Sequence, residues 1–391
     1  MSRLLKRKQP RNVDAEALVA RGTAPSKSVG ATAGLPVRRA AGVETIVHLL
    51  IIAAAVLIGY SNVFHAPFVF DDFAGIVDNA VIKDLDNFIS STRGYDFSPR
   101  RFIGYLTFAL NYHFGGLEVV GFHIINLAVH MASSVLVYFL VALTFRTPYF
   151  GLRRPEEGGR KMMALFSGLL FASHPIQTQA VTYICQRFAS LATCFYLLSV
   201  VMYIKGRLAM QRPENAGQRA EGGGRDTSSH MRSIPFYLCS LVSAVLAMRT
   251  KETAFTLPFA IILYEFIFFK STRKQKLLFL LPVLLALAIA PLALMTTGKP
   301  LGDVLSSLDA QTRVQSALPR WDYLMTQLRV ITTYIRLIFL PINQNLDYDY
   351  PIYDSLFTPS VFLSFLFLST LLGSAVYLIY RSRSSPSVLR V

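Results

Sequence analysis

Residues 45–63 read TIVHLLIIAAAVLIGYSNV, and this stretch decides the fold class. His48 is its only side chain that titrates near neutral pH, and as a helix rising about 1.5 Å per residue the segment crosses about 30 Å of hydrocarbon. The whole chain agrees, because 53% of its 391 residues are hydrophobic, only 16% are charged, and the mean hydropathy is +0.43. The sequence therefore predicts an all-α polytopic membrane protein and excludes an ordinary soluble domain.

The net charge of +16 is divided between the two sides of the membrane. The segments that we place in the cytoplasm carry 27 Lys and Arg residues against 8 acidic ones, whereas those outside carry 7 against 13. This is the distribution that the positive-inside rule requires, so the N-terminus is predicted to be cytoplasmic and nucleic acid is not implied. The cytoplasmic segments are 1–44, 146–161, 205–232, 270–276 and 381–391, and the outer ones are 64–118, 296–323 and 341–358.

Composition also suggests how the chain is organised. We expect a disordered basic cytoplasmic arm over 1–44, a transmembrane domain of about eight or nine helices over 45–380, and a short basic tail over 381–391. Within the domain we expect a first outer loop over 64–118, a cytoplasmic linker over 205–232, and a second outer or re-entrant region over 296–358.

The segments of this domain differ in how strongly their sequences predict that they span the membrane. Phe102–Phe114 is too short to span and is expected to lie along the interface, whereas Phe122–Phe145 and Val181–Ile204 are expected to cross. Leu324–Leu340 is apolar but carries two arginines. If it crosses, the basic tail falls outside, against the charge rule, so we favour a re-entrant or tilted segment.

An acidic pair, Asp71 and Asp72, opens the first outer loop between Phe70 and Phe73. Charge at a membrane boundary is costly unless it is solvated or used. A hydroxyl nucleophile needs a carboxylate within hydrogen-bond reach to take its proton. Neighbouring residues point in different directions, so one carboxylate is expected to face a site while the other caps, solvates or holds a cation. The structural alternative is a solvated pair that caps the next helix.

Cationic side chains cluster at the same predicted face. Arginine binds phosphate oxygens in pairs and keeps its charge, which suits a site that releases a phosphate. Arg187 and Arg336, each inside an apolar segment, are the most expensive to bury and are our first candidates. The structural alternatives are snorkelling for Arg100 and Arg101, and a turn ion pair for Lys251 and Glu252. The cationic set comprises Arg100, Arg101, Arg187, Arg249, Lys251, Arg329 and Arg336.

Three histidines stand beside or inside apolar segments. His174 precedes Pro175, which ends a helix, and is either a hydrogen-bonded structural group or a site residue. His123, Asn126 and His130 share one helix face, and because their spacing is not a zinc signature we expect helix-to-helix hydrogen bonds. No glycine-rich phosphate loop or nucleotide fingerprint is visible, which disfavours an enzyme that takes nucleotide sugars in a soluble domain.

Several motifs together resemble a known family. The order and spacing of these motifs are similar to those of the membrane part of the transmembrane and tetratricopeptide-repeat O-mannosyltransferases and their bacterial relatives. That group has the GT-C architecture, a multi-helix membrane core with its active site on the outer face. The motifs are Phe70-Asp71-Asp72, LTFALNY at 106–112, Gly115-Gly116, Gly121-Phe122-His123, Asn126 to His130, HPIQTQAV at 174–181, and Lys251-Glu252.

The resemblance implies an inverting glycosyltransferase that moves mannose or a similar hexose from a polyprenyl-phosphate carrier to a hydroxyl of an exported protein or glycan. Asp71 or Asp72 would be the catalytic base, and the resemblance favours Asp71, the first acid of the pair. The group expected to bind the lipid phosphate or substrate comprises Arg187, Arg336, Arg329, Lys251, Glu252, His174 and Arg101. A divalent cation held by carboxylates is left open as the only cofactor.

This sequence also departs from the family. Gln177 and Gln179 stand where the family often has His and Glu, and no helical repeat array follows the membrane part. The alternative hypothesis is therefore a non-catalytic lipid-phosphate-binding protein or assembly subunit, a truncated GT-C relative. A transporter has no support from inverted repeats. The absence of Asn-x-Ser/Thr sequons favours a bacterial inner membrane over endoplasmic reticulum.

Overall fold

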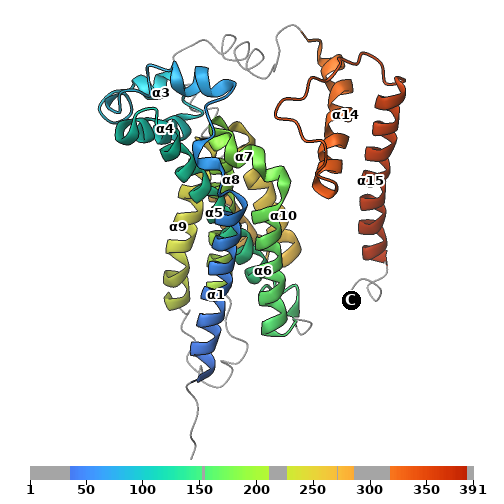
Figure 1. Cartoon of the computed structure of the whole chain (residues 1–391). Coiled ribbons are helices and arrows are strands. Elements are labelled where there is room, and N and C mark those ends of the chain that lie inside the picture. Colours follow the sequence, from blue (N-terminus) through green and yellow to red (C-terminus); the bar gives the residue numbers. More distant parts are fainter. Residues whose placement is uncertain (1–35, 152–154, 211–226, 271, 286–317, 385–391) are drawn as a thin grey trace, which may run out of the picture. The chain divides into compact units, whose positions relative to one another are not determined.

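The computed structural model describes residues 36–151, 155–210, 227–270, 272–285 and 318–384. In this part of the chain every regular element is a helix (Figure 1). The predicted all-α class is therefore confirmed. The chain forms two units, residues 1–44 and residues 45–391, and the second contains the elements that build the site.

The longer helices are α1 (Pro36–Gly59), α4 (Phe102–Gly115), α5 (Val119–Thr144), α6 (Glu157–Ser173), α8 (Arg187–Ala209), α9 (Thr227–Met248), α10 (Leu257–Phe268), α11 (Arg273–Leu285), α14 (Arg320–Phe339) and α15 (Pro359–Ser384). The short elements are η1 (Val63–His65), η2 (Phe73–Val77), α2 (Asp86–Ile89), α3 (Arg93–Phe97), η4 (Pro175–Gln177), α7 (Thr178–Thr182), η5 (Ile184–Gln186) and η6 (Glu252–Thr256).

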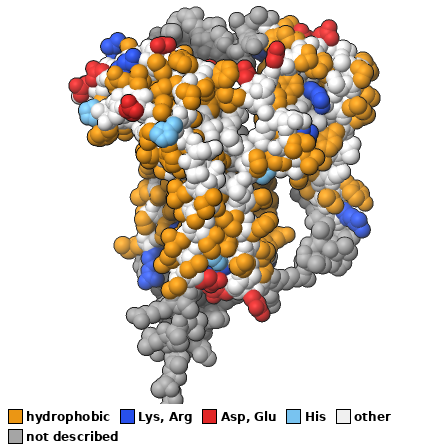
Figure 2. Space-filling model, viewed as in Figure 1, with side chains coloured by type: hydrophobic (Ala, Val, Ile, Leu, Met, Phe, Trp, Pro, Cys, Tyr) orange, Lys and Arg blue, Asp and Glu red, His pale blue; other side chains and the backbone are white. Residues whose placement is uncertain are grey.

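Five of the described helices are long and apolar enough to cross a membrane. Figure 2 shows hydrophobic side chains dominating the middle of the visible face, while acidic side chains lie toward its two ends. The structure thus supports a multi-pass membrane protein, and the total of about eight or nine spans stays a prediction. The five segments are Gly42–Gly59, Val119–Thr144, Ile184–Ala209, Met231–Met248 and Pro359–Arg381.

Several element boundaries differ from those read off the sequence. α1 begins at Pro36, inside the arm that we expected to be irregular up to residue 44. α8 runs to Ala209 and α9 starts at Thr227, so the predicted linker is bounded by helix at both ends. α15 continues to Ser384, into the predicted tail. The short segment at Phe102–Phe114 forms a helix, α4, and its place along the membrane interface stays a prediction.

Other parts of these predictions lie outside the described residues. They are residues 1–35 of the arm, 211–226 of the linker, 286–295 of a span that we expected over Leu277–Met295, 296–317 of the second outer region, and 385–391 of the tail.

The span predicted over Val181–Ile204 is present, but its helix starts later than we expected. α7 ends at Thr182, Tyr183 has an extended conformation with ψ of 110°, and α8 starts only at Arg187. The break creates a free backbone N–H at Cys185, which donates to the carboxylate of Asp72 at 2.6 Å. A contact between residues 113 positions apart therefore decides where this helix begins.

Small side chains bring α8 close to α9. The Ser199 hydroxyl donates to the Ser240 carbonyl and the Ser240 hydroxyl to the Ser199 carbonyl, both at 2.8 Å. About two turns further along α8, the Tyr237 ring approaches Gly206 closely. A Cβ added to this glycine would lie 3.0 Å from the ring, so a larger residue would not fit without a shift. Small residues and hydroxyl bonds of this kind are what hold helices together in lipid, where apolar burial gives no driving force.

We call the C-terminal end of α8 its inner end and the N-terminal end its outer end, after the sides of the membrane predicted for them. The inner end carries a buried ion pair with α10. Arg207 donates to both carboxylate oxygens of Glu265, at 2.8 and 2.9 Å, and the Tyr203 hydroxyl donates to the same carboxylate at 3.0 Å. The guanidinium also lies over the rings of Phe269 and Phe279. Glu265 is completely buried, so the charge of each partner is compensated by the other.

At the outer end, a separate apolar core orders the first outer loop. It joins η2, α2, α4, α5, η5 and the start of α8. The Phe108 ring packs against Phe122 and Phe188, with ring centroids 6.2 and 5.3 Å apart. This core fixes the loop that carries the acidic pair against the helix that starts at Arg187. Its buried members are Ile76, Ile82, Phe88, Phe108, Ala109, Phe122, Ile184 and Phe188.

Candidate functional site

The acidic pair is divided between the interior and the surface. Asp72 is fully buried, and its two carboxylate oxygens accept hydrogen bonds from the backbone N–H groups of Cys185, at 2.6 Å, and Val69, at 3.0 Å. Burial raises the pKa of Asp72 above its usual value despite these two bonds. Asp71 is exposed, and no hydrogen bond of its carboxylate is found in the part of the chain that the structure describes. Asp72 therefore holds the loop, and Asp71 is the carboxylate available for chemistry.

The residue before the pair has a strained backbone. Phe70 has a φ of +45°, in the left-handed region that a side chain with a Cβ rarely adopts. Such a conformation costs about 1–3 kcal/mol and persists only where surrounding contacts impose it. The Phe70 side chain is 61% exposed, so apolar burial does not account for the strain. This strained residue directly precedes the exposed Asp71 and the buried Asp72.

Tyr183 contacts the exposed member of the pair. Its hydroxyl oxygen accepts a hydrogen bond from the Asp71 backbone N–H at 2.9 Å. Tyr183 is only 6% exposed, and burial, with a further contribution from the Asp71 charge, raises the pKa of its phenol to about 12. The phenol thus stays protonated at any physiological pH and acts as a neutral, fixed partner of the turn.

A cationic group faces the same region from α4 and the turn before α10. Arg101 forms an ion pair with Glu252 at 3.3 Å and lies over the Phe188 ring at 5.4 Å from its centroid. Burial, then the Arg101 charge, lowers the pKa of Lys251, and among the described residues its ammonium has no hydrogen bond or ion pair. The turn ion pair expected for Lys251 and Glu252 is thus not formed, because Glu252 pairs with Arg101.

The electrostatics of Tyr105 place the acidic and cationic groups together. Burial raises the pKa of this phenol, and the charges of Arg101, Asp71 and Glu252 all act on it as well. Asp71 and the Arg101–Glu252 pair are thus within electrostatic range of one phenol, and we treat them as one candidate site.

Arg249 fastens the cationic turn to the outer loop. Its guanidinium donates to the Tyr95 hydroxyl at 2.9 Å and to the Pro99 carbonyl at 3.2 Å, and its carbonyl accepts from the Ile103 N–H at 3.1 Å. These bonds hold Lys251 beside α4, so Arg249 positions the turn.

The structure corrects the role predicted for Arg187. This side chain is completely buried, and its guanidinium is surrounded by neutral oxygens and lies 4.5 Å from the centroid of the Phe108 ring. It has no exposed surface with which to bind a lipid phosphate, so we assign it a structural role at the start of α8. Its hydrogen-bond acceptors are Asn126 Oδ1, Asn111 Oδ1 and the carbonyl oxygens of Thr107 and Phe122.

His174 and Arg336 belong to a second group of contacts. Nε2 of His174 donates to the Ile338 carbonyl at 2.9 Å and its Nδ1 accepts from the Ile176 N–H at 3.2 Å, so the ring links η4 to α14. Arg336 donates to the Ile342 carbonyl at the end of its own helix, at 3.3 Å. No contact in the described part of the chain joins Arg336 or Arg329 to Asp71.

The polar stripe on α5 makes the contacts predicted for it. Nε2 of His123 bonds to the Ala66 carbonyl at 2.9 Å and Nε2 of His130 to the Ala172 carbonyl at 3.0 Å. Asn126 donates to the Val181 carbonyl at 3.3 Å. The expectation of structural hydrogen bonds to neighbouring segments is confirmed for this stripe.

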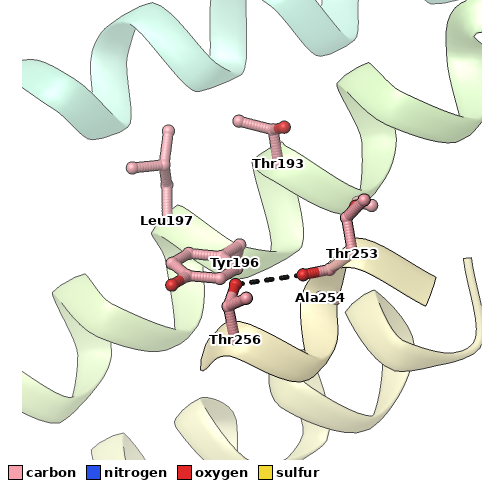
Figure 3. Close-up of a pocket in the computed structure, with 7 residues that line it drawn as sticks. Thr193, Tyr196, Leu197, Thr253, Ala254 and Thr256 are labelled. Atoms are coloured by element: carbon pink, nitrogen blue, oxygen red, sulfur yellow. Dashed lines mark hydrogen bonds between the residues drawn. The ribbon is translucent and has the colours of Figure 1, made fainter. Parts of the chain in front are cut away.

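A groove of about 350 Å³ lies between α8 and η6, directly after the Lys251–Glu252 turn. Figure 3 shows Tyr196 of α8 beside Thr256 of η6, and the Thr256 hydroxyl donates to the Thr253 carbonyl at 3.0 Å. The groove is also lined by Thr193, Leu197 and Ala254. Its surface is mostly apolar with a few hydroxyls. A groove of this kind, between one helix that can span the membrane and a turn with cations, suits an amphiphile.

No cluster of three or more His, Cys, Asp or Glu side chains able to hold a metal occurs among the described residues. The divalent cation that we left open therefore stays a prediction.

Sequence reasoning missed Tyr183, Cys185 and the Arg207–Glu265 pair. Tyr183 comes two residues after the HPIQTQAV motif, inside the stretch that we expected to be a single spanning helix. Glu265 is the only charged residue in an apolar segment. Because an acid inside a membrane needs a partner, its position could have predicted a buried ion pair.

Comparison with known proteins supports the family resemblance. The chain is 31% identical over 174 residues to protein O-mannosyl-transferase TMTC4 of Homo sapiens, covering 40% of this chain and 22% of that protein. It is 28% identical over 225 residues to TMTC4 of Mus musculus, covering 53% and 28%. It is 33% identical over 162 residues to Tmtc1 of Drosophila melanogaster, covering 39% and 17%.

No family model and no solved structure matches the chain. The matched segment spans less than a third of the length of each of these three relatives. The predicted resemblance to the membrane part of the TMTC protein O-mannosyl-transferases is confirmed over this segment.

Proposed function

We propose that this protein is a glycosyltransferase that moves mannose or a similar hexose from a polyprenyl-phosphate carrier to a hydroxyl of an exported protein or glycan, at the outer membrane face. The observation that carries the proposal is that Asp71 has an exposed carboxylate, and that the charges of Asp71, Arg101 and Lys251 all act on one group, the Cys185 thiol. The relatives named as protein O-mannosyl-transferases support the transferase class.

The reaction assigns a task to each charge. The acceptor hydroxyl attacks the anomeric carbon of the sugar, its proton passes to the Asp71 carboxylate, and the bond between that carbon and the phosphate oxygen breaks. Attack opposite the leaving group inverts the configuration. A correctly placed general base contributes about 10²–10⁴-fold to such a step.

The departing phosphate needs positive charge beside it. Lys251 has no ion pair in the described part of the chain, so its ammonium is available to phosphate oxygens. Arg101 is half-exposed, and Glu252 holds one side of its guanidinium fork while leaving the remaining N–H groups to a ligand. Arg329 and Arg336 stay predicted phosphate ligands from α14.

The groove between α8 and η6 supports a lipid-linked donor. It starts at the residue after Glu252 and continues along α8 beside Tyr196. An anionic head at Lys251 with an apolar chain in the groove satisfies both ends of a polyprenyl phosphate. Placement in a bacterial inner membrane is part of this proposal, although the relatives named above are from animals.

The test is sugar transfer by the purified protein in detergent, with polyprenyl-phosphate mannose and a Ser/Thr-rich peptide. We expect Asp71→Asn to lower the rate by about 10²–10⁴-fold. The matched control is Asp78→Asn, which removes another exposed carboxylate of the same outer loop and should leave the rate unchanged. Full activity of Asp71→Asn would exclude Asp71 as the base.

A second candidate is a non-catalytic lipid-phosphate-binding protein, which the cationic turn and the groove also favour. It requires Lys251 but not Asp71. Binding of polyprenyl phosphate that is lost in Lys251→Ala and retained in Asp71→Asn, with no transfer by the wild type for any sugar and acceptor tried, would select this candidate.

A further inference from the structure

Both members of the acidic pair are held by one short segment, the connection between α7 and α8. The Tyr183 hydroxyl accepts from the Asp71 N–H at 2.9 Å, and the Cys185 N–H donates to the Asp72 carboxylate at 2.6 Å. The two contacts have different consequences. Cys185 binds a carboxylate and buries it, whereas Tyr183 binds only the backbone of Asp71 and leaves its carboxylate exposed.

Tyr183 also contacts the strained residue beside Asp71. The rings of Phe70 and Tyr183 meet edge to face, with centroids 6.5 Å apart. Phe70 has a φ of +45°, which the chain would leave if the surrounding contacts were removed. The Phe70 ring is largely exposed, so burial does not hold this conformation. Two bonds between Val69 and Asp72 span the turn, and the bond from the Asp71 N–H to Tyr183 is the contact that ties it to the segment before α8.

We propose that Tyr183 is a positioning residue whose hydroxyl keeps the Phe70–Asp71 turn in the conformation that presents the Asp71 carboxylate at the outer face. The inference rests on the proposed function for its catalytic consequence, while its structural part stands without it. The ring of Tyr183 is buried, so the hydroxyl is held in a fixed place from which it can orient the turn.

The hydroxyl acts through geometry and not through proton transfer. Without it, the Asp71 N–H loses its partner, and Phe70 can relax toward a negative φ, which rotates the next carboxylate. A displacement of about 1 Å at a reacting group can lower a rate about 10²-fold. Binding of the donor depends on other residues, so the loss should appear in kcat and leave KM nearly unchanged.

The first experiment measures the turn directly, by hydrogen exchange of the backbone amides. In Tyr183→Phe, which keeps the ring, we expect the Asp71 amide to exchange at least about tenfold faster. The matched control is Tyr264→Phe, which also removes a tyrosine hydroxyl that makes a hydrogen bond. That bond is to Thr144, at the C-terminal end of α5, at 2.7 Å, so its loss should not change the exchange of the Asp71 amide. Equal protection of Asp71 in Tyr183→Phe and in the wild type would overturn the proposal.

The second experiment uses Phe70→Gly, because glycine adopts a positive φ without strain. We expect Tyr183→Phe to lower kcat about tenfold to a hundredfold in the wild type, with KM within about threefold, and to lower it less than about threefold in the Phe70→Gly background. Equal losses in both backgrounds would show that the hydroxyl does not hold this turn, and would contradict the proposal.

The two experiments separate this inference from the proposed function. If Asp71→Asn retains full transfer, Asp71 is not the base, yet faster exchange in Tyr183→Phe would still establish that Tyr183 holds the turn. If Asp71→Asn is inactive while Tyr183→Phe has normal exchange and a normal kcat, the proposed function stands and the positioning role is wrong.

Discussion

The two ends of α8 each bury an arginine, and the two side chains are held by different kinds of partner. At the outer end, Arg187 is surrounded by neutral carbonyl and amide oxygens. At the inner end, Arg207 is held by the carboxylate of Glu265 in a two-point ion pair. Both satisfy their hydrogen bonds, so the difference lies in charge and not in geometry.

The difference shows what each end of the bundle can do. The inner pair is electrically neutral and joins α8 to α10. The outer arginine keeps its positive charge, and the nearest carboxylate that acts on it is Asp72, which already has two backbone partners. The buried positive charge of Arg187 is thus balanced by hydrogen bonds to neutral oxygens and not by an ion pair. The predictions below test this contrast.

The largest effect is expected at the inner pair. Glu265→Gln leaves the Arg207 charge buried without a counter-charge, which costs about 3–5 kcal/mol. We expect a large fall in the thermal unfolding temperature of the detergent-solubilised protein. Replacing both partners, Arg207→Met with Glu265→Leu, should recover most of the loss because no uncompensated charge remains. A single substitution that leaves stability unchanged would show that this pair is not buried.

A smaller loss is expected at the outer end. Arg187→Met removes four hydrogen bonds but leaves only neutral groups unpaired, so we expect a cost of about 2–3 kcal/mol. Arg187→Lys should lose nearly as much, since a single ammonium cannot replace the planar fork. The same unfolding assay applies. Destabilisation by Arg187→Met larger than by Glu265→Gln would reverse the contrast between the two ends.

The pH dependence of stability should report the buried acid of the outer site. The folded-state pKa of Asp72 is raised above its usual value of 3.8 by burial, so the folded protein binds more protons than the unfolded chain between the two values. The free energy of unfolding should therefore fall as the pH rises through that window. Asp72→Asn should remove this fall, while Asp78→Asn should keep it. Identical pH profiles for Asp72→Asn and the wild type would contradict the assignment.

The smallest effect is expected in the groove. Thr193→Trp places a large ring in the groove beside the cationic turn and should raise the KM for the lipid donor about threefold to tenfold with little change in kcat. The matched control is Ser167→Trp in a second groove of about 350 Å³, which lies next to His174 and away from Lys251. If only Ser167→Trp increases the KM, the lipid chain binds in that second groove and not in the one beside Lys251.

Part of this architecture could be predicted from sequence because it depends on local patterns. Long apolar runs gave the all-α class, and the short aromatic segment at Phe102–Phe114 gave α4. The position of the acidic pair could be recognised because Asp71 and Asp72 interrupt a run of aromatic residues. These signals are all contained within a few neighbouring residues.

The rest depends on contacts between distant segments. Apolar periodicity could not show that α8 starts only at Arg187, because the break before it is fixed by Asp72, more than a hundred positions earlier. An arginine in an apolar segment indicates a side chain with specific partners, but the sequence does not show whether those partners are charged or neutral. Arg187 was therefore mistaken for a phosphate ligand when its partners are neutral and internal.

The reciprocal serine bonds between α8 and α9 have a consequence for how such proteins can vary. Ser199 and Ser240 each donate to the other's carbonyl, so the register of the two helices is set at their contact surface. The sequence and length of the connection between these helices are then not needed to set that register. Insertions and deletions in this connection should accumulate freely among related proteins, while a change at either serine should require a compensating change at the other.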